Sequence, residues 1–126
     1  MNRQERNELK ELVLAFSSDD IGVVAHFTQV VNGTIESIRL TSPAITEADN
    51  LSVSISGIGT QETLATITVG TSELTTTVYP FAYMHDANGI TGSPFVFTKR
   101  VVNGQMFFNE GTSDPNVNYT AVVRYY

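Results

Sequence analysis

The sequence predicts a mainly β protein: a single antiparallel β-sandwich, jelly-roll-like or immunoglobulin-like, of about eight strands, preceded by a short N-terminal α-helix. Two observations predict this class. Runs that alternate apolar and polar residues recur about every 8–12 residues, which is the spacing typical of sandwiches and barrels. Asn-Gly dipeptides lie at 32–33, 88–89 and 103–104, and Asn-Gly favours the type I′ hairpin turn because both central positions need positive φ.

Residues 2–16 are predicted to form an amphipathic helix, so that residues 1–18 make an N-terminal arm and residues 19–126 the sandwich domain. Four apolar residues recur at the i, i+3, i+4, i+7 spacing of one helix face: Leu9, Leu12, Val13 and Phe16. Basic and acidic side chains flank this stripe on opposite sides, which suits packing of identical helices or docking on a partner protein. The stripe suits equally well a helix that covers one end of its own sandwich, and both readings stay open.

The body contains eight predicted strands. They are residues 23–31, 35–40, 51–56, 65–69, 78–84, 95–102, 105–108 and 119–126. The third strand alternates most cleanly, with an apolar face and a hydroxyl face. Pro80 cannot donate a ladder hydrogen bond, so its segment is expected to be an edge strand or to bend and change sheet. The turns at Asn32-Gly33 and Asn103-Gly104 are expected to be corners that reverse the chain.

Composition limits the function classes. The chain has 126 residues and no cysteine, which removes disulfides, thiolate metal sites and cysteine nucleophiles. Its net charge is −6, and after residue 11 only four residues are basic: Arg39, Lys99, Arg100 and Arg124. Such a chain repels phosphate backbones, so nucleic-acid binding is disfavoured. No apolar run is long enough to span a bilayer or to act as a signal peptide, so no membrane partner is expected.

Candidate chemistry is sparse. His85-Asp86 is the one place where a histidine adjoins a carboxylate, but adjacent strand residues point to opposite faces, and a polar hairpin turn explains the pair. His26 is expected to be a half-buried structural residue. The segment from Asp114 to Asn118 has oxygen ligands at alternate positions, yet it lacks the glycine and the final carboxylate of a calcium loop. We therefore expect no catalytic, cofactor or metal site, and a protein that is not an enzyme.

Aromatic residues are the remaining resource for binding. Tyr79, Phe81 and Tyr83 share one face of a predicted strand, as in the aromatic platforms of carbohydrate-binding sandwiches. Aromatic residues at strand spacing are also the usual filling of a core. Tyr125 and Tyr126 are expected to be pinned into the sheet or held by a neighbouring subunit. The turn at Asn88-Gly89 has polar flanks, unlike the other two, and is the hairpin tip expected to touch a partner.

Three segments carry a resemblance to a known class of proteins: residues 35–43, residues 48–55 and residues 119–126. An extended strand, a short acidic turn, a Ser/Thr-alternating strand and a closing strand resemble small virion proteins of tailed bacteriophages, particularly capsid decoration or cement proteins. The resemblance covers roughly residues 30–126 and follows general β-sandwich patterns. It implies a non-enzymatic role on the capsid surface, often as a trimer that bridges capsid subunits. The N-terminal helix has no counterpart in it.

The sequence thus favours a virion structural protein that self-associates and binds capsid or other virion proteins. The alternative is a glycan- or host-surface-binding module of a phage fibre or spike. Residues expected at the partner interface are Leu9, Leu12, Val13, Phe16, Tyr79, Phe81, Tyr83, Asn88, Gly89, Tyr125 and Tyr126.

Overall fold

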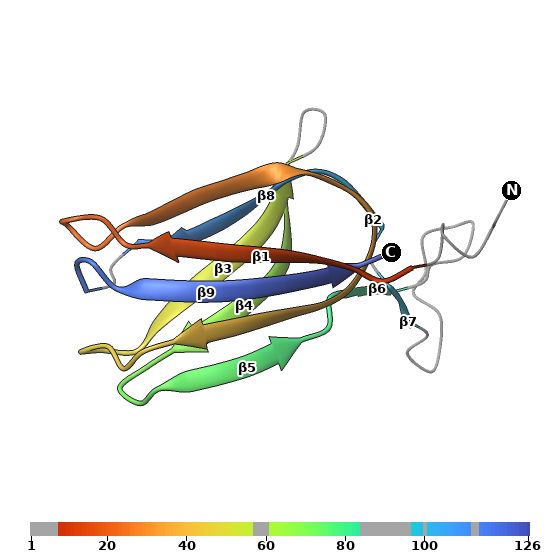
Figure 1. Ribbon diagram of the computed structural model, residues 1–126. Coiled ribbons are helices and arrows are strands. Elements are labelled where there is room, and N and C mark those ends of the chain that lie inside the picture. Colours follow the sequence, from red (N-terminus) through yellow and green to blue (C-terminus); the bar gives the residue numbers. More distant parts are fainter. Residues whose placement is uncertain (1–7, 57–60, 84–96, 100, 112–113) are drawn as a thin grey trace, which may run out of the picture.

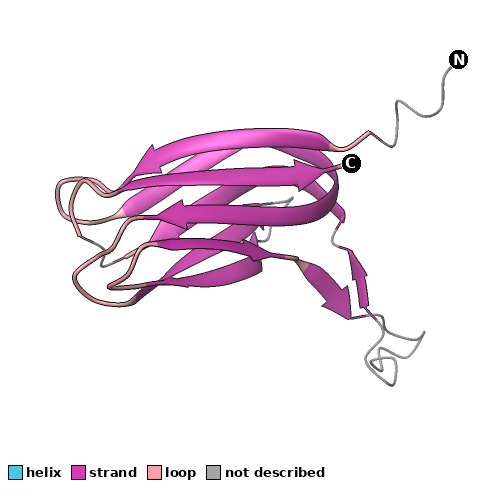
Figure 2. Ribbon diagram, turned by 60° about the horizontal axis from the view of Figure 1, so that its bottom comes forward, coloured by secondary structure: helices cyan, strands magenta, loops and turns pink. Residues whose placement is uncertain are grey.

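The computed structural model describes residues 8–56, 61–83, 97–99, 101–111 and 114–126. These ranges contain nine strands. The bounds are β1 Lys10–Ser17, β2 Val24–Ser42, β3 Asp49–Ser56, β4 Gln61–Val69, β5 Leu74–Val78, β6 Phe81–Tyr83, β7 Phe97–Lys99, β8 Val101–Glu110 and β9 Asn118–Tyr125. Figure 2 shows strands and loops throughout the described part of the chain. The mainly β, antiparallel class predicted from the sequence is therefore confirmed.

Seven of the strands form one antiparallel sheet curled into a half-barrel (Figure 1). The order along it is β1-β9-β2-β8-β3-β4, and β5 pairs with β2 off this path. In Figure 1, β1, β9 and β5 lie in the front layer, and β8, β3 and β4 lie behind them. Strands β6 and β7 form a separate two-stranded sheet.

Strand β2 joins the two layers because it is long and bent. Over its 19 residues it pairs first with β8, from Val24 to Thr34, and then with β9, from Ile35 to Thr41. Its register slips between Ile35 and Ser37, which marks a bulge, and bulges bend a strand and increase its twist. One strand thus turns the corner that carries the sheet from the back layer to the front layer.

The core lies between the two layers. The alternation predicted for β3 is confirmed, since Leu51, Val53 and Ile55 are buried. Aromatic rings gather around Phe16, whose ring centroid is 5.1 Å from Phe108, 5.3 Å from His26 and 5.5 Å from Tyr119. The half-buried structural role expected of His26 agrees with this stacking. Large apolar and aromatic side chains facing inward from both layers supply the hydrophobic stabilisation of the fold.

The helix predicted over residues 2–16 is wrong where the structure can be compared with it, because residues 10–17 form strand β1. Leu14 and Phe16 are buried and Leu12 is half-buried, whereas Val13 is 64% exposed. The segment therefore fits period 2 as well as period 3.6, and pairing with β9 decides between them. Residues 1–7 lie outside the described part. Strand β1 belongs to the same sheet as the rest of the body, and Ser18 to Val23 form the turn into β2.

The prediction that Asn32-Gly33 and Asn103-Gly104 reverse the chain is also wrong. Both dipeptides lie inside strands, and the two Val-Val-Asn-Gly repeats pair with each other. Asn32 is the Cα partner of Asn103, and Gly33 is the partner of Val102. The dipeptide at 88–89 lies outside the described residues. Tertiary pairing has overridden the local turn preference in both repeats.

The prediction for Pro80 is confirmed. Strand β5 ends at Val78, Pro80 follows, and the chain continues in β6, which belongs to the two-stranded sheet. A residue without a backbone N–H sits where the chain leaves one ladder for another.

Candidate functional site

The apolar residues predicted to share one helix face do not share a face in the structure. Phe16 points into the core, Leu12 packs against it, and Val13 is on the outer surface. Leu9 precedes β1 and is 42% exposed. On the outer face of β1, Glu11 accepts a hydrogen bond of 3.0 Å from Nε of Arg124.

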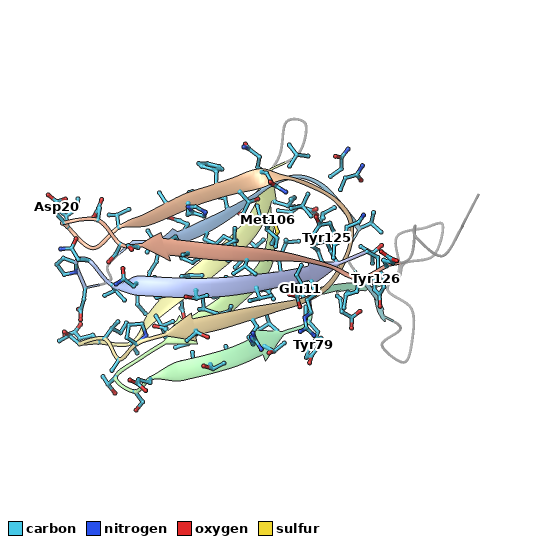
Figure 3. The ribbon with its side chains drawn as sticks, viewed as in Figure 1. Glu11, Asp20, Tyr79, Met106, Tyr125 and Tyr126 are labelled. Atoms are coloured by element: carbon cyan, nitrogen blue, oxygen red, sulfur yellow. The ribbon has the colours of Figure 1, made fainter. Side chains whose placement is uncertain are left out.

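Tyr79, Tyr125 and Tyr126 lie at one end of the molecule (Figure 3). Tyr79 follows β5 and is 64% exposed. Tyr125 packs against the core, with Lys10 Nζ 5.7 Å from its ring centroid. Tyr126 is held at the bend of β2, where its N–H donates to the Thr34 carbonyl at 2.9 Å. Of the two alternatives expected for this segment, the structure shows the pinning into the sheet, and a contact with a neighbouring subunit stays a prediction.

Several named residues are not described. Phe81 and Tyr83 have backbones in β6, but their side chains lie outside the described part. Asn88, Gly89, His85 and Asp86 lie in the range 84–96, which is outside it altogether.

The loop considered for calcium is organised by the protein's own donors. Oδ2 of Asp114 accepts hydrogen bonds from the backbone N–H and the hydroxyl of Thr46, both at 2.8 Å. The side-chain oxygen of Asn118 accepts one from Ser17 at 2.7 Å. Two of the candidate oxygen ligands thus tie this loop to neighbouring segments. No group of three His, Cys, Asp or Glu side chains that could hold a metal occurs among the described residues.

An apolar hollow of about 510 Å³ lies along strands β4 and β5. We call this hollow, with the two strand edges beside it, the seam. It is lined by Leu64, Ala65, Thr66, Thr77, Val78, Tyr79 and Pro80. Strand β4 ends the order of the main sheet, and β5 pairs with β2 on one side. Within the described ranges, each of these strands therefore has an edge without a ladder partner. Unpaired strand edges are templates for another strand.

A partly exposed aromatic pair, which the sequence did not predict, lies on the outer surface of β2 and β8. Phe27 on β2 and Phe107 on β8 are Cα partners whose rings stack with centroids 4.2 Å apart, and Phe27 is 53% exposed. Phe27 lies outside the buried face of its strand, where Val24, Thr28 and Val31 are the buried residues among residues 24–31. Beside the pair lies a hollow of about 210 Å³. Its lining residues are Ser52, Ser54, Thr63, Phe107 and Asn109.

A small basic hollow of about 120 Å³, which we call the arginine groove, lies on the outer face of β9, β2 and β5. Its lining residues are Ser37, Arg39, Thr77, Tyr79, Val122 and Arg124. Register explains why they meet: Arg39 is the Cα partner of both Thr77 and Val122, and Ser37 is the partner of Arg124. Arg39 is exposed and makes no hydrogen bond or ion pair with any described residue. Two of the four basic residues after residue 11 thus line one hollow.

Another hollow, of about 750 Å³, lies where the end of β2 and the starts of β5 and β9 come together. Hydroxyl and amide side chains dominate its lining: Thr41, Ser42, Pro43, Glu73, Leu74, Thr75, Asn116, Val117, Asn118 and Thr120. Glu73 is its one carboxylate, and its lining has no histidine. This hollow therefore has hydrogen-bonding groups but no paired acid and base.

The described residues include no helix of the length and hydropathy needed to cross a membrane.

No protein-family model matches the chain, and no curated protein sequence matches it. A solved structure described as "Bacillus endospore appendages form a novel family of disulfide-linked pili" is similar at 14% identity. The match covers 94% of this chain and 86% of that chain, with a TM-score of 0.45.

Proposed function

We propose that this chain is a non-enzymatic structural protein that assembles with further copies or other proteins through its strand edges. The observation that carries the proposal is the seam, where two strand edges flank an apolar hollow of about 510 Å³. A strand from a partner can hydrogen-bond to such an edge while its side chains fill the hollow. Strand β1, which ends the sheet order on the other side, is an edge of the kind that could be donated.

The specific form of the proposal is a capsid decoration or cement protein that bridges capsid subunits, on the resemblance of residues 35–43, 48–55 and 119–126. A cement protein needs a rigid scaffold with free edges, and a stable contact needs on the order of 1,600 Å² of buried surface. An antiparallel sheet curled into a half-barrel offers that scaffold. A trimer is the favoured oligomer in this proposal.

The seam is tested by substitutions on β4. Ala65→Glu puts a carboxylate into the seam, and Thr68→Glu puts the same charge at an exposed position of β4 that does not line the hollow. Sedimentation velocity over a concentration series should give assemblies for the wild type and Thr68→Glu, and weaker assembly for Ala65→Glu. Circular dichroism before each run confirms that both variants are folded.

The capsid form is tested by mass spectrometry of purified phage particles, which should contain the chain in stoichiometric amounts. A wild-type chain that stays monomeric at every concentration and is absent from particles would contradict the proposed function.

A glycan-binding module is a second candidate, favoured by the stacked pair Phe27 and Phe107 beside the hydroxyl-lined hollow. Aromatic faces pack against the C–H faces of sugars, and Ser, Thr and Asn side chains can meet their hydroxyl groups. A glycan array should show binding that Phe27→Ala abolishes and Val101→Ala, at another exposed apolar residue of this sheet, leaves unchanged. Equal binding by the two variants, or none by the wild type, would exclude this candidate.

A further inference from the structure

One end of the molecule has carboxylates and no basic residue. Four connections meet at one end: the β1–β2 turn, the β2–β3 loop, the β4–β5 turn and the β8–β9 loop, at the left of Figure 1. The residues of this end include no Lys, Arg or His. They include five carboxylates: Asp19, Asp20, Glu47, Glu73 and Asp114. A sixth, Asp49, follows at the start of β3. The arginine groove includes Tyr79, which lies at the opposite end from Asp20 in Figure 3.

The β1–β2 turn is built to project one carboxylate and one apolar side chain. Oδ1 of Asp19 accepts the backbone N–H groups of Ile21 at 3.0 Å and Val23 at 2.8 Å. The N–H of Asp19 donates to the Val23 carbonyl at 2.9 Å, and Gly22 takes a positive φ of 89° that suits glycine. These bonds fix the turn, so little conformational entropy is lost when its tip binds.

The tip itself is free to bind. Asp20 is exposed and makes no hydrogen bond or ion pair with any described residue. The neighbouring Ile21 is 75% exposed, so its side chain offers apolar surface next to this carboxylate. A charged group and an apolar group thus stand side by side on a rigid turn.

The arginine groove has the complementary chemistry. The Nε of Arg124 is bonded to Glu11, which fixes the guanidinium and leaves its two terminal nitrogens to donate elsewhere. Arg39 beside it is an unpaired cation among the described residues, and Tyr79 and Val122 add apolar surface. The volume of about 120 Å³ equals that of roughly four water molecules in the liquid, so it suits one or two side-chain ends.

We propose that the Asp20-Ile21 tip of a second copy of this chain docks in the arginine groove, with the carboxylate on Arg39 and Arg124 and the isoleucine against Tyr79 and Val122. This rests on the proposed function and adds a contact that does not use the seam. The tip and the groove are different surfaces, so the contact is heterologous: copies related by it form a ring if the rotation closes and a filament if it does not.

A charged contact on the surface must weaken with salt, because added ions screen it. Sedimentation velocity of the wild type should therefore show smaller assemblies at high than at low ionic strength. Asp20→Ala and Arg39→Ala should each weaken association about tenfold or more, as expected for a charged anchor of an interface. Glu47→Ala is the matched control, since Glu47 lies on another loop of the same acidic end and should leave association unchanged.

Mixing gives the sharpest result. Asp20→Ala keeps an intact groove and Arg39→Ala keeps an intact tip. In an equimolar mixture the tip of Arg39→Ala can enter the groove of Asp20→Ala, so the mixture should associate more strongly than either variant alone at the same total concentration. Because the native chain has no cysteine, disulfide cross-linking can test directly whether the tip lies in the groove. Ile21→Cys and Thr77→Cys, mixed under mild oxidation, should form a disulfide-linked heterodimer, whereas Ile21→Cys with Thr68→Cys should not.

The outcomes separate the two proposals. If Asp20→Ala and Arg39→Ala assemble as the wild type does and the mixed cysteine variants stay unlinked, tip-to-groove docking is wrong, and Ala65→Glu still tests the seam. If those variants lose association and Ala65→Glu does not, docking stands and the seam is wrong.

Discussion

The backbone carbonyl of Tyr126 lies where a side chain on Gly33 would begin. A Cβ built on Gly33 would overlap that oxygen. Hydrogen bonds of 2.9 and 3.3 Å join the backbone of Tyr126 to that of Thr34, the residue after Gly33. Gly33 has a φ of +156°, outside the range that L side chains prefer. The glycine is thus required at the bend of β2 by close packing of two backbones and not by a hairpin turn.

Gly33→Ala should lower the free energy of unfolding by about 2 kcal/mol or more, because both the clash and the backbone conformation oppose a Cβ. Chemical denaturation followed by circular dichroism measures this. Gly70→Ala is the control, since a Cβ there meets nothing within 4 Å, and it should change stability by less than about 0.5 kcal/mol.

Leu14→Ala and Val13→Ala distinguish strand from helix at the N-terminal segment. In the strand, Leu14 is 8% exposed and Val13 is 64% exposed. Leu14→Ala should therefore cost about 2–3 kcal/mol of stability, and Val13→Ala less than about 0.5 kcal/mol. The predicted helix, with Val13 in its apolar stripe, requires the opposite ranking. Thermal or urea unfolding of the two variants gives the ranking.

Tyr119→Phe should cost about 1–3 kcal/mol, the usual penalty for removing a donor from a buried acceptor. The hydroxyl of Tyr119 donates to Oε2 of Glu110 at 2.8 Å, and Glu110 is 1% exposed. Tyr125→Phe, at a half-buried ring on the same strand, should be close to neutral in the same urea titration. Equal effects of the two substitutions would mean that the buried hydrogen bond contributes nothing.

Asp114→Ala should destabilise the protein by about 1 kcal/mol, because its carboxylate accepts two hydrogen bonds from Thr46 and links two loops. Asp20→Ala, at a carboxylate without such bonds among the described residues, should leave stability unchanged. Millimolar calcium should not raise the melting temperature of the wild type. A calcium-dependent rise that Asp114→Ala removes would instead identify an ion site in this loop.

The sequence predicted the class of the fold because apolar residues at period 2 are a local signal. Leu51, Val53 and Ile55 illustrate it, since each is buried as its spacing indicates. The change of sheet at Pro80 was also predictable, because a residue without a backbone N–H cannot donate a hydrogen bond to a strand ladder wherever it lies. The alternation in β3 and the effect of Pro80 both depend mainly on residues that are close in the sequence.

The errors came from signals that satisfy two structures at once. Leu12 and Phe16 lie on one face of a helix and also on one face of a strand, and only the partner strand β9 decides. Asn32-Gly33 suits a turn, yet the same glycine suits a bend where another backbone passes. The arginine groove could not be predicted for a different reason. Arg39 and Arg124 are brought together by cross-strand register, which local sequence does not contain.

The pairing of β1 with β9 has a consequence for how the molecule is made. Lys10 is the Cα partner of Tyr125, so nearly the whole described chain must leave the ribosome before this ladder can close. Folds dominated by such long-range pairs fold slowly, typically in milliseconds to seconds, because the entropy of closing a large loop is lost before the stabilising contacts form. During synthesis, the apolar side of β1 stays exposed until β9 has been made. In that interval a chaperone or another copy of the chain can bind to it.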